Sequence, residues 1–371
     1  MIRVATYNVE NLFRRAEALY QDTWQESEPI LNDWNKMNRT LAKAVYSDAD
    51  KEFIAEFLVK YKLHLRDSRK EKFFSLREIR GKLFKIPRGS NTPEIIASGR
   101  DDWDGFIEMK RTEVKSAAVR NTGLVLQALN ADVVALMEVE DRTALKRFSE
   151  DILGPLDGQV AYDRYMLIDG NDERGIDVGL FSRFPIVNIC SHVDAGLPAS
   201  RIFSRDCAEY EVALDNGDRL WIMVNHFKSK GFGNAAANNA RRLAQAEEVA
   251  RLYTKRLETH DLVIVAGDLN DTPTSAPLAP LVQNTDLRDA MSHPTYTSKP
   301  GVRPGTFGTG TPRNKIDYLL LSPKLWDKVH DVDVERRGVW APNTFPHFDE
   351  VDGPLTAASD HAAVWADLDI N

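Results

Sequence analysis

The chain has 371 residues, the composition of an ordinary globular protein and a formal net charge of −8. This length accommodates two average domains, but a large α/β enzyme commonly uses it as one. No apolar run is long enough to cross a bilayer, and the acidic balance argues against a surface coated in basic residues for duplex DNA, although local patches can still bind nucleic acid.

The chain opens on an expected strand at Arg3–Asn8, with Glu10 two residues beyond Asn8. Residues two apart on an extended segment point to the same side. These first residues read as a folded strand and not as the charged region and apolar stretch of a secretory signal. With Met1 as the native start, we expect a cytoplasmic protein.

The segment 21–105 interrupts the rhythm of the chain. Twelve basic and five acidic residues lie between Lys51 and Arg88, a local balance of +7. Phe53, Phe57 and Tyr61 recur at helical spacing, and could either stack on nucleic-acid bases or pack against the protein body. We interpret the segment as a basic, mostly helical insertion.

Beyond the insertion, apolar strands alternate with helical periodicity. Helices are expected at Glu108–Asn130 and Asn238–Leu257, where apolar residues recur on one face. The expected strands are Val133–Met137, Val178–Phe181, Leu220–Val224, Leu262–Ala266, Ile316–Leu321 and Ala362–Leu368. Strands interleaved with helices predict a layered α/β protein.

Carboxylates at strand ends form a candidate metal site. Glu138 follows the apolar strand Val133–Met137, and Asp360 stands at the entry to the last strand. Hard oxygen ligands from separate strands, with no cysteine among them, suit Mg²⁺ or Mn²⁺. The alternative is that such strand-end acids are merely solvated.

Two of the eight histidines have sequence neighbours that favour a catalytic role. His226 closes a strand, and His361 directly follows Asp360. Histidine exchanges protons near neutral pH when a carboxylate orients its ring, and Asp317 is the natural partner for His361. We interpret the remaining histidines as structural, namely His64, His192, His260, His293, His330 and His347.

Asp268 and Asn270 cap the strand Leu262–Ala266, with Gly267 permitting a tight turn. The two side chains can address one point, Asp268 taking a proton from water and Asn270 holding the water or a phosphate. The alternative is a turn in which both side chains satisfy backbone groups.

The two cysteines, Cys190 and Cys207, make no disulfide framework and no zinc site by themselves. Either thiol could act as a nucleophile, but neither sits in a motif. We interpret both as small buried side chains.

The order of these polar segments resembles the endonuclease/exonuclease/phosphatase family, which has the deoxyribonuclease-I-like fold. The resemblance covers residues 1–20 and 106–371, and the segments around Asn8 and His226 look closest to bacterial nuclease-like members. It implies a four-layer α/β sandwich of two packed β-sheets flanked by helices, in a single domain spanning 1–371, with the site at one end. The residues that carry it are Asn8, Glu138, His226, Asp268, Asn270, Asp317, Asp360 and His361.

The resemblance also implies a role for each residue. Glu138 is the main metal ligand, assisted by Asn8, Glu10 and Asp360. His361 and Asp317 form an acid–base pair, Asp268 and Asn270 position or activate water, and His226 stabilises or protonates the phosphate. We add Arg183, Asn225 and Lys228 from the same segments as candidate substrate-binding residues.

Two features depart from the family pattern. Met137 precedes Glu138 where the family usually has glutamine, so a hydrogen bond that orients the ligand is not expected here. The insertion at 21–105 has no counterpart in compact members and follows the first strand.

The expected chemistry is in-line attack of water on phosphorus with Mg²⁺ or Mn²⁺ bound. DNA or RNA is the expected substrate, since the basic insertion offers phosphate contacts. A phosphomonoesterase or lipid phosphodiesterase is the alternative enzyme, and a non-catalytic interaction module is the alternative class. No membrane association and no obligate protein partner are evident.

Overall fold

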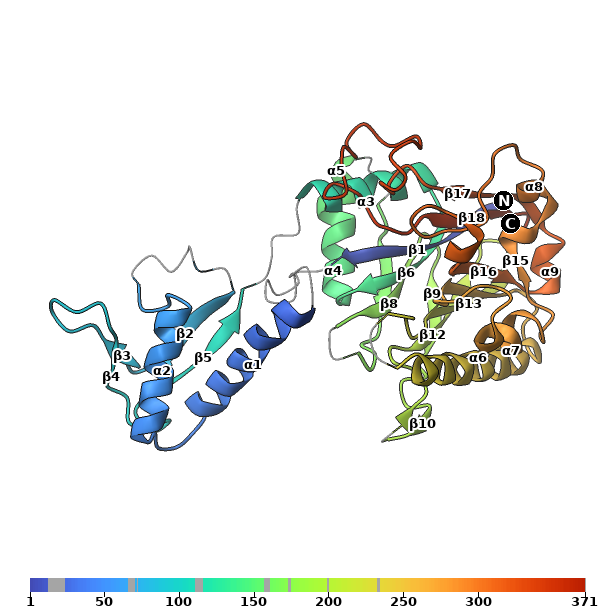
Figure 1. Ribbon diagram of the computed structural model, residues 1–371. Coiled ribbons are helices and arrows are strands. Elements are labelled where there is room, and N and C mark those ends of the chain that lie inside the picture. The colour runs from blue at the N-terminus through green and yellow to red at the C-terminus, as the bar shows by residue number, and fades with distance from the viewer. Residues whose placement is uncertain are drawn as a thin grey trace. The chain divides into compact units, whose positions relative to one another are not determined.

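The computed structural model describes residues 1–12, 24–65, 71, 73–110, 116–156, 161–172, 175–198, 200–231 and 234–370. The chain divides into two compact units (Figure 1). The larger unit comprises Met1–Phe13 and Lys115–Asn371, and the smaller unit is Arg14–Val114.

The larger unit contains two six-stranded sheets. In the first sheet, β1 and β6 run parallel and the other neighbours are antiparallel. Its strands, in spatial order, are β17 (Val329–Glu335), β18 (Ala363–Leu368), β1 (Ile2–Leu12), β6 (Val133–Val139), β8 (Asp177–Ser182) and β7 (Arg164–Leu167).

The second sheet repeats this pattern, because β13 and β14 are parallel and their neighbours antiparallel. Its strands, in spatial order, are β15 (Arg288–Asp289), β16 (Asp317–Leu321), β14 (Val263–Asp268), β13 (Arg219–His226), β12 (Cys207–Ala213) and β9 (Ile186–Cys190). A short hairpin of β10 (Gly196–Leu197) and β11 (Ser200–Arg201) lies between β9 and β12 in the chain.

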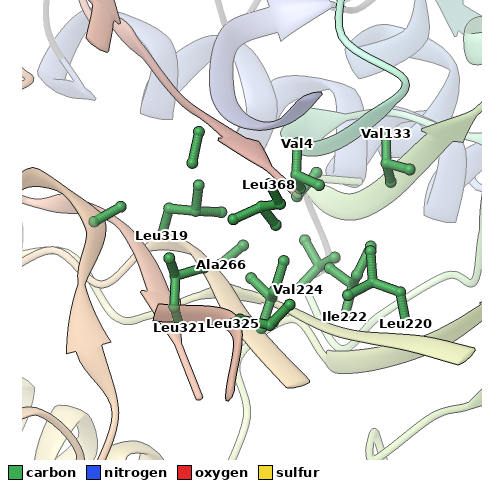
Figure 2. Packing of buried hydrophobic residues seen from close by; sticks show 14 of the residues in the cluster. Val4, Val133, Leu220, Ile222, Val224, Ala266, Leu319, Leu321, Leu325 and Leu368 are labelled. Atoms are coloured by element: carbon green, nitrogen blue, oxygen red, sulfur yellow. The ribbon is translucent and has the colours of Figure 1, made fainter. Parts of the chain in front are cut away.

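The two sheets pack face to face around an apolar core. Figure 2 shows Val4 and Val133 of the first sheet opposite Ile222 and Val224 of the second. Each of these side chains is excluded from water, and full burial of a side chain of this size stabilises the fold by about 1.5–3 kcal/mol. This core fixes the register at which the strand ends of the two sheets meet.

Helices cover the outer faces of both sheets. The first sheet packs against α3 (Ser116–Leu129), and the second against α6 (Ala235–Leu257). Figure 1 shows α3 and α6 on opposite sides of the stacked sheets. The shorter helical segments are α4 (Arg142–Arg147), a π-helical turn (Phe148–Leu153), α5 (Gly154–Leu156), α7 (Ala279–Val282), α8 (Pro294–Thr297), α9 (Pro323–Trp326) and 3₁₀ turns at Ala276–Leu278, Ala290–Ser292 and Pro312–Asn314. The predicted four-layer α/β sandwich is confirmed.

The continuous apolar run in β6 follows from burial on both faces. Val133, Ala135 and Met137 point into the core between the sheets, whereas Val134 and Leu136 pack in the cluster under α3. Such a strand needs no alternation of polar residues, since neither face meets water.

The smaller unit has a core of its own. It consists of α1 (Trp24–Leu41), α2 (Asp48–Lys60) and two antiparallel strand pairs, β2 (Phe74–Arg80) with β5 (Asp104–Met109) and β3 (Phe84–Lys85) with β4 (Glu94–Ile95). The sequence interpretation lacked these strands, and the expected helix from Glu108 begins only at Ser116 because Glu108 belongs to β5. A single domain spanning 1–371 stays a prediction.

Two of the three aromatic residues on α2 and its C-cap are core residues. Phe57 and Tyr61 are buried, and their rings lie 5.6 and 4.6 Å from the ring of Phe74. The alternative that they stack on nucleic-acid bases is therefore wrong. Phe53 is half-buried and carries the ammonium of Lys36 4.1 Å above its ring.

Among the described residues, no helix combines the length and apolar character that a bilayer span requires.

Candidate active site

The polar residues converge where strand ends of the two sheets meet. The parallel pairs β1–β6 and β13–β14 bring Asn8, Glu138, His226 and Asp268 to their carboxyl ends. Asp317 begins the antiparallel β16 directly opposite Asp268. The amide of Asn8 reaches across from the first sheet and donates to Asp268 Oδ2 at 3.3 Å. We call this group, with Glu10, Asn270, Asp360 and His361, the strand-end site.

His361 and Asp317 form a buried dyad. The Nδ1 atom of His361 lies 2.9 and 3.0 Å from the two carboxylate oxygens of Asp317. Burial alone would lower the pKa of His361, but the charges and hydrogen bond of Asp317 outweigh it and raise that pKa well above its ordinary value. The dyad therefore favours an imidazolium whose Nε2 remains directed into the site.

The dyad is held in place by residues whose individual roles were not predicted from the sequence. The Thr306 hydroxyl donates to Asp317 Oδ2 at 2.5 Å and accepts from the Asp317 amide at 3.0 Å. Ser359 Oγ accepts from the His361 amide at 2.9 Å and donates to the Asn8 carbonyl at 2.8 Å. The ring of Phe307 meets the His361 ring edge-on, with centroids 5.0 Å apart.

The Nε2 atom of His361 faces groups from three segments. It lies 3.5 Å from the Asn8 amide nitrogen, 3.9 Å from Asp268 Oδ2 and 3.6 Å from Asp360 Oδ1. His226 Nε2 approaches the same Asp268 oxygen at 3.6 Å. Two imidazoles and a carboxylate thus surround one point, as proton transfer to and from a bound phosphate ester requires.

Asp268 and Asn270 form the expected tight turn and still face the site. The backbone N–H of Asn270 donates to Asp268 Oδ1 at 2.8 Å, and the side-chain Nδ2 of Asn270 donates to Asp268 Oδ2 at 3.0 Å. The turn and the catalytic interpretation are therefore compatible. Burial and the charge of Asp317 raise the pKa of Asp268 to about 7, which suits a base that takes a proton near neutral pH.

A second set of carboxylates lies beside the dyad. Glu10 Oε2 accepts from the Asp360 amide at 2.8 Å. Desolvation and repulsion from Asp360 raise the pKa of Glu10 to about 7, although the residue is exposed. The pKa of Asp360 is also raised, first by desolvation and then by the charge of Glu138.

Irregular backbone conformations orient the side chains of Glu10 and Glu138. Glu10 and Glu138 have φ values of 41° and 65°, and both lie where the register between neighbouring strands shifts. Left-handed conformations are costly for residues other than glycine and concentrate at functional sites. These positions turn the side chains out of the strand alternation and toward the site.

Among the described residues at this site, one group of side chains could hold a cation. Ligand atoms of Asp268, Asp317 and His361 lie within 4.8 Å of one another. In that group Asp317 and His361 Nδ1 bind each other, so a cation held there would replace that hydrogen bond. Asn8, Glu10, Glu138 and Asp360 offer only oxygen ligands, which suit a hard divalent cation, and their role as the metal ligands stays a prediction.

Three sequence predictions concern substrate binding. Arg183 directly follows β8, and the last residue of β8, Ser182, pairs with Val133 of β6. Val133 is at the opposite end of β6 from Glu138, which is roughly 16 Å away at the usual rise per residue. The guanidinium of Arg183 donates to Asn130 and Asp132. Arg183 therefore does not join the strand-end site, which corrects that expectation.

Asn225 is also corrected, because strand alternation points it away from the site. It is fully buried on the face of β13 that carries Trp221 and Met223 under α6, and its amide donates to the Met223 carbonyl. Lys228 follows the strand and is half-buried, and its backbone is fixed by Gln245 and Arg242. A substrate contact for Lys228 stays a prediction.

Met137 occupies its predicted place before Glu138. Its side chain is buried between the sheets, and its sulfur accepts from the Thr6 hydroxyl at 3.9 Å. Residue 137 therefore supplies no amide to orient Glu138.

Residues 115–361 match the model of the endonuclease/exonuclease/phosphatase family, about two thirds of the chain. The chain belongs to this family. The predicted resemblance is thereby confirmed, and family members are hydrolases that act on phosphate esters.

Solved structures with a similar fold include truncated TDP2 of Caenorhabditis elegans, which is 18% identical, with 68% of this chain and 91% of that chain covered and a TM-score of 0.46. A mannosyl-6-phosphatase of Bacteroides thetaiotaomicron is 17% identical, with 68% and 90% covered and a TM-score of 0.48. An endonuclease/exonuclease/phosphatase of Bacteroides vulgatus is 17% identical, with 69% and 91% covered and a TM-score of 0.48. No curated protein matches the chain.

Proposed function

We propose that this protein is a divalent-metal-dependent phosphodiesterase and that it hydrolyses DNA or RNA. The observation that carries the proposal is the buried Asp317–His361 dyad, in which Nε2 of His361 faces Asp268, Asn8 and Asp360. A proton donor, a proton acceptor and a set of oxygen ligands are thus assembled around one point.

The metal would be held by Asn8, Glu10, Glu138 and Asp360, with Mg²⁺ or Mn²⁺ as the ions that suit oxygen ligands. When bound, such a cation neutralises the non-bridging oxygens of the phosphate and the developing charge of the leaving group. The crowding of Glu10, Glu138 and Asp360 supports this role, since three neighbouring carboxylates repel one another without a counter-ion.

The protein's own groups move the protons. Asp268 accepts a proton from the attacking water while Asn270 holds that water, and the new O–P bond forms in line with the bond that breaks. His361, kept protonated by Asp317, gives the proton from Nε2 to the departing oxygen. His226, buried beside Asp268, stabilises the charge on the phosphate.

A basic groove in the smaller unit supports a nucleic-acid substrate. A cavity of about 590 Å³ between α1 and α2 is lined by Lys36, Arg39, Lys43 and Phe53, among others. Lys36 and Arg39 are exposed, whereas Lys43 is paired with Asp50 at 2.5 Å. Clustered cations beside an aromatic ring suit a phosphate backbone with unstacked bases.

The test uses purified protein with labelled single- and double-stranded DNA, RNA, an abasic duplex, a phosphomonoester and a phospholipid, each with Mg²⁺ and with chelator. We expect metal-dependent cleavage of nucleic acid. Cleavage of only the phosphomonoester or the phospholipid would favour the alternative enzymes. Absence of hydrolysis on every substrate would favour an interaction module and contradict the proposal.

A further inference from the structure

A second cluster of metal-ligand side chains lies away from the strand-end site. Cys190 ends β9, the edge strand of the second sheet, and Glu209 lies opposite it on β12. His192 follows two residues later, with Nε2 3.8 Å from Cys190 Sγ and 2.7 Å from Glu209 Oε1. One ligand atom from each residue lies within 4.8 Å of the other two. We call these three residues the edge cluster.

Hydrogen bonds from neighbouring residues orient the side chains of the edge cluster. Arg256 donates from Nε and Nη2 to Glu209 Oε2 at 2.9 and 2.8 Å, which leaves Oε1 directed at His192. The guanidinium of Arg256 is itself packed 3.6 Å above the ring of Trp221. Asp206 Oδ1 accepts from the His192 amide at 2.7 Å. Hydrogen bonds of this kind orient the ligands in protein metal sites.

The donor set has a definite chemical preference. A thiol, an imidazole and a carboxylate together suit Zn²⁺, which binds sulfur, nitrogen and oxygen in tetrahedral sites, whereas Mg²⁺ and Mn²⁺ prefer oxygen alone. The 3.8 Å between sulfur and nitrogen is close to the separation of two ligands on one tetrahedral zinc ion, given zinc–ligand bonds of about 2.0–2.3 Å.

We propose that Cys190, His192 and Glu209 bind one Zn²⁺ ion. Glu209 is buried, while Cys190 and His192 are only half-buried, so a solvent molecule can complete the tetrahedron. Binding replaces the proton on the Cys190 sulfur and the hydrogen bond between His192 and Glu209, and releases the thiol proton to solvent. The ion ties the edge strand β9 and the segment after it to β12.

The two metal sites are separate. Cys190 lies on β9 and Asp268 on β14, with β12 and β13 between them in the sheet order. Three steps between neighbouring strands correspond to about 14 Å. Only the edge cluster contains sulfur, so a probe of sulfur ligation reports on it alone.

The experiment titrates the full-length protein with Co²⁺ in the presence of excess Mg²⁺ and records its absorption spectrum. Co²⁺ replaces Zn²⁺ in such sites, and a thiolate ligand gives a charge-transfer band that oxygen and nitrogen ligands do not give. We expect the band to saturate at one equivalent and to disappear on addition of one equivalent of Zn²⁺. The Cys190→Ser and His192→Ala variants should each lose it.

Cys207→Ala is the matched control, because Cys207 is fully buried and lies outside the edge cluster. It should keep the band. Bound zinc counted by elemental analysis after gel filtration should be one equivalent in the wild type and absent in Cys190→Ser. A wild-type protein that gives no charge-transfer band, or a Cys190→Ser variant that keeps it, would overturn the proposal.

Discussion

At the residue scale, the chemistry depends on how neighbouring charges set the protonation of His361, Asp268 and Glu10. His361 is held as an imidazolium by Asp317, whereas Asp268 is driven toward a pKa of about 7 by burial and by the same Asp317. In the proposed mechanism, one buried carboxylate thus prepares an acid and a base side by side, with pKa values that differ as hydrolysis at neutral pH requires.

Removing the acid should therefore remove the reaction. We expect His361→Ala to lower kcat on the best nucleic-acid substrate by roughly 10²–10⁴-fold, the usual contribution of a general acid or base. Asp317→Asn should also lower kcat, because the amide cannot stabilise the imidazolium, and should shift the pH profile where a merely structural residue would not. Retention of full kcat in His361→Ala would refute the assignment of the dyad.

The raised pKa of Asp268 predicts a stability effect in the metal-free protein. Between an unfolded-state pKa of about 4 and the folded value of about 7, the folded chain binds more protons than the unfolded chain. The contribution of Asp268 to the unfolding free energy therefore falls as pH rises through that window. Asp268→Asn should lack this decline.

Urea unfolding in chelator at a series of pH values measures the effect. The variant should gain stability relative to the wild type as pH increases from about 4 to about 7, and then keep a constant advantage. Saturating Mg²⁺ should reduce the difference, since a nearby cation favours the ionised carboxylate. A difference that is flat with pH would contradict the raised pKa.

At the element scale, the strands that carry the site could be predicted from sequence, and the turns between them only in part. The predicted strands at Val133–Met137 and Leu220–Val224 are confirmed, because an apolar run between polar ends is a strong local signal. The helix predicted at Asn238–Leu257 is confirmed as α6, which begins three residues earlier where Asn234 caps it.

The sequence could not predict which way each side chain points or which distant residues lie in contact. Thr306 lies in a glycine-rich loop before Asp317, and its hydrogen bond to Asp317 depends on the tertiary fold. Arg183 and Asn225 lie within recognised motif segments, yet strand direction and alternation place them away from the site. A sequence motif identifies a segment, whereas the alternation of side chains along the strand determines which of them face the site.

Gly267 illustrates how closely the strands approach at the site. It has a φ of 135°, and a Cβ atom there would lie 1.9 Å from the Asn225 carbonyl oxygen. Gly267→Ala must separate β13 from β14 beside Asp268. We expect a loss of at least about 1–3 kcal/mol in unfolding free energy and a matching loss of kcat.

Gly353→Ala provides the control, because nothing lies within 4 Å of a Cβ atom built there. Chemical denaturation and steady-state kinetics on both variants separate crowding from a general effect of added methyl groups. Equal stability of the two variants would contradict the close approach at Gly267.

At the scale of the whole molecule, the acidic chain concentrates positive charge in one segment of its sequence. The balance of +7 between Lys51 and Arg88 belongs to the smaller unit, which also contains the groove of Lys36 and Arg39. Its fold was poorly predicted from sequence, because short strand pairs such as β3–β4 leave almost no periodic signal. Charge was the more informative property of this segment.

Reversal of the groove charges tests its use. In the double variant Lys36→Glu/Arg39→Glu, we expect KM for nucleic acid to rise and the slope of log affinity against log salt to fall by about 2, one per lost phosphate contact. Hydrolysis of a small phosphodiester should be unchanged. Lys324→Glu, an exposed lysine of the larger unit, is the matched control.

If the double variant and the Lys324→Glu control behave alike on nucleic acid, the groove takes no part in substrate binding.

The proposed mechanism depends most on Glu138 and its neighbours, which would hold the divalent cation beside the Asp317–His361 dyad. The direct measurement is Mg²⁺ binding by calorimetry and hydrolysis in parallel, on the wild type, Glu138→Gln and His361→Ala. We predict that Glu138→Gln loses both Mg²⁺ affinity and turnover, while His361→Ala binds Mg²⁺ as the wild type does and has a kcat lowered by roughly 10²–10⁴-fold. Unchanged Mg²⁺ affinity in Glu138→Gln, or hydrolysis that persists in chelator, would contradict it.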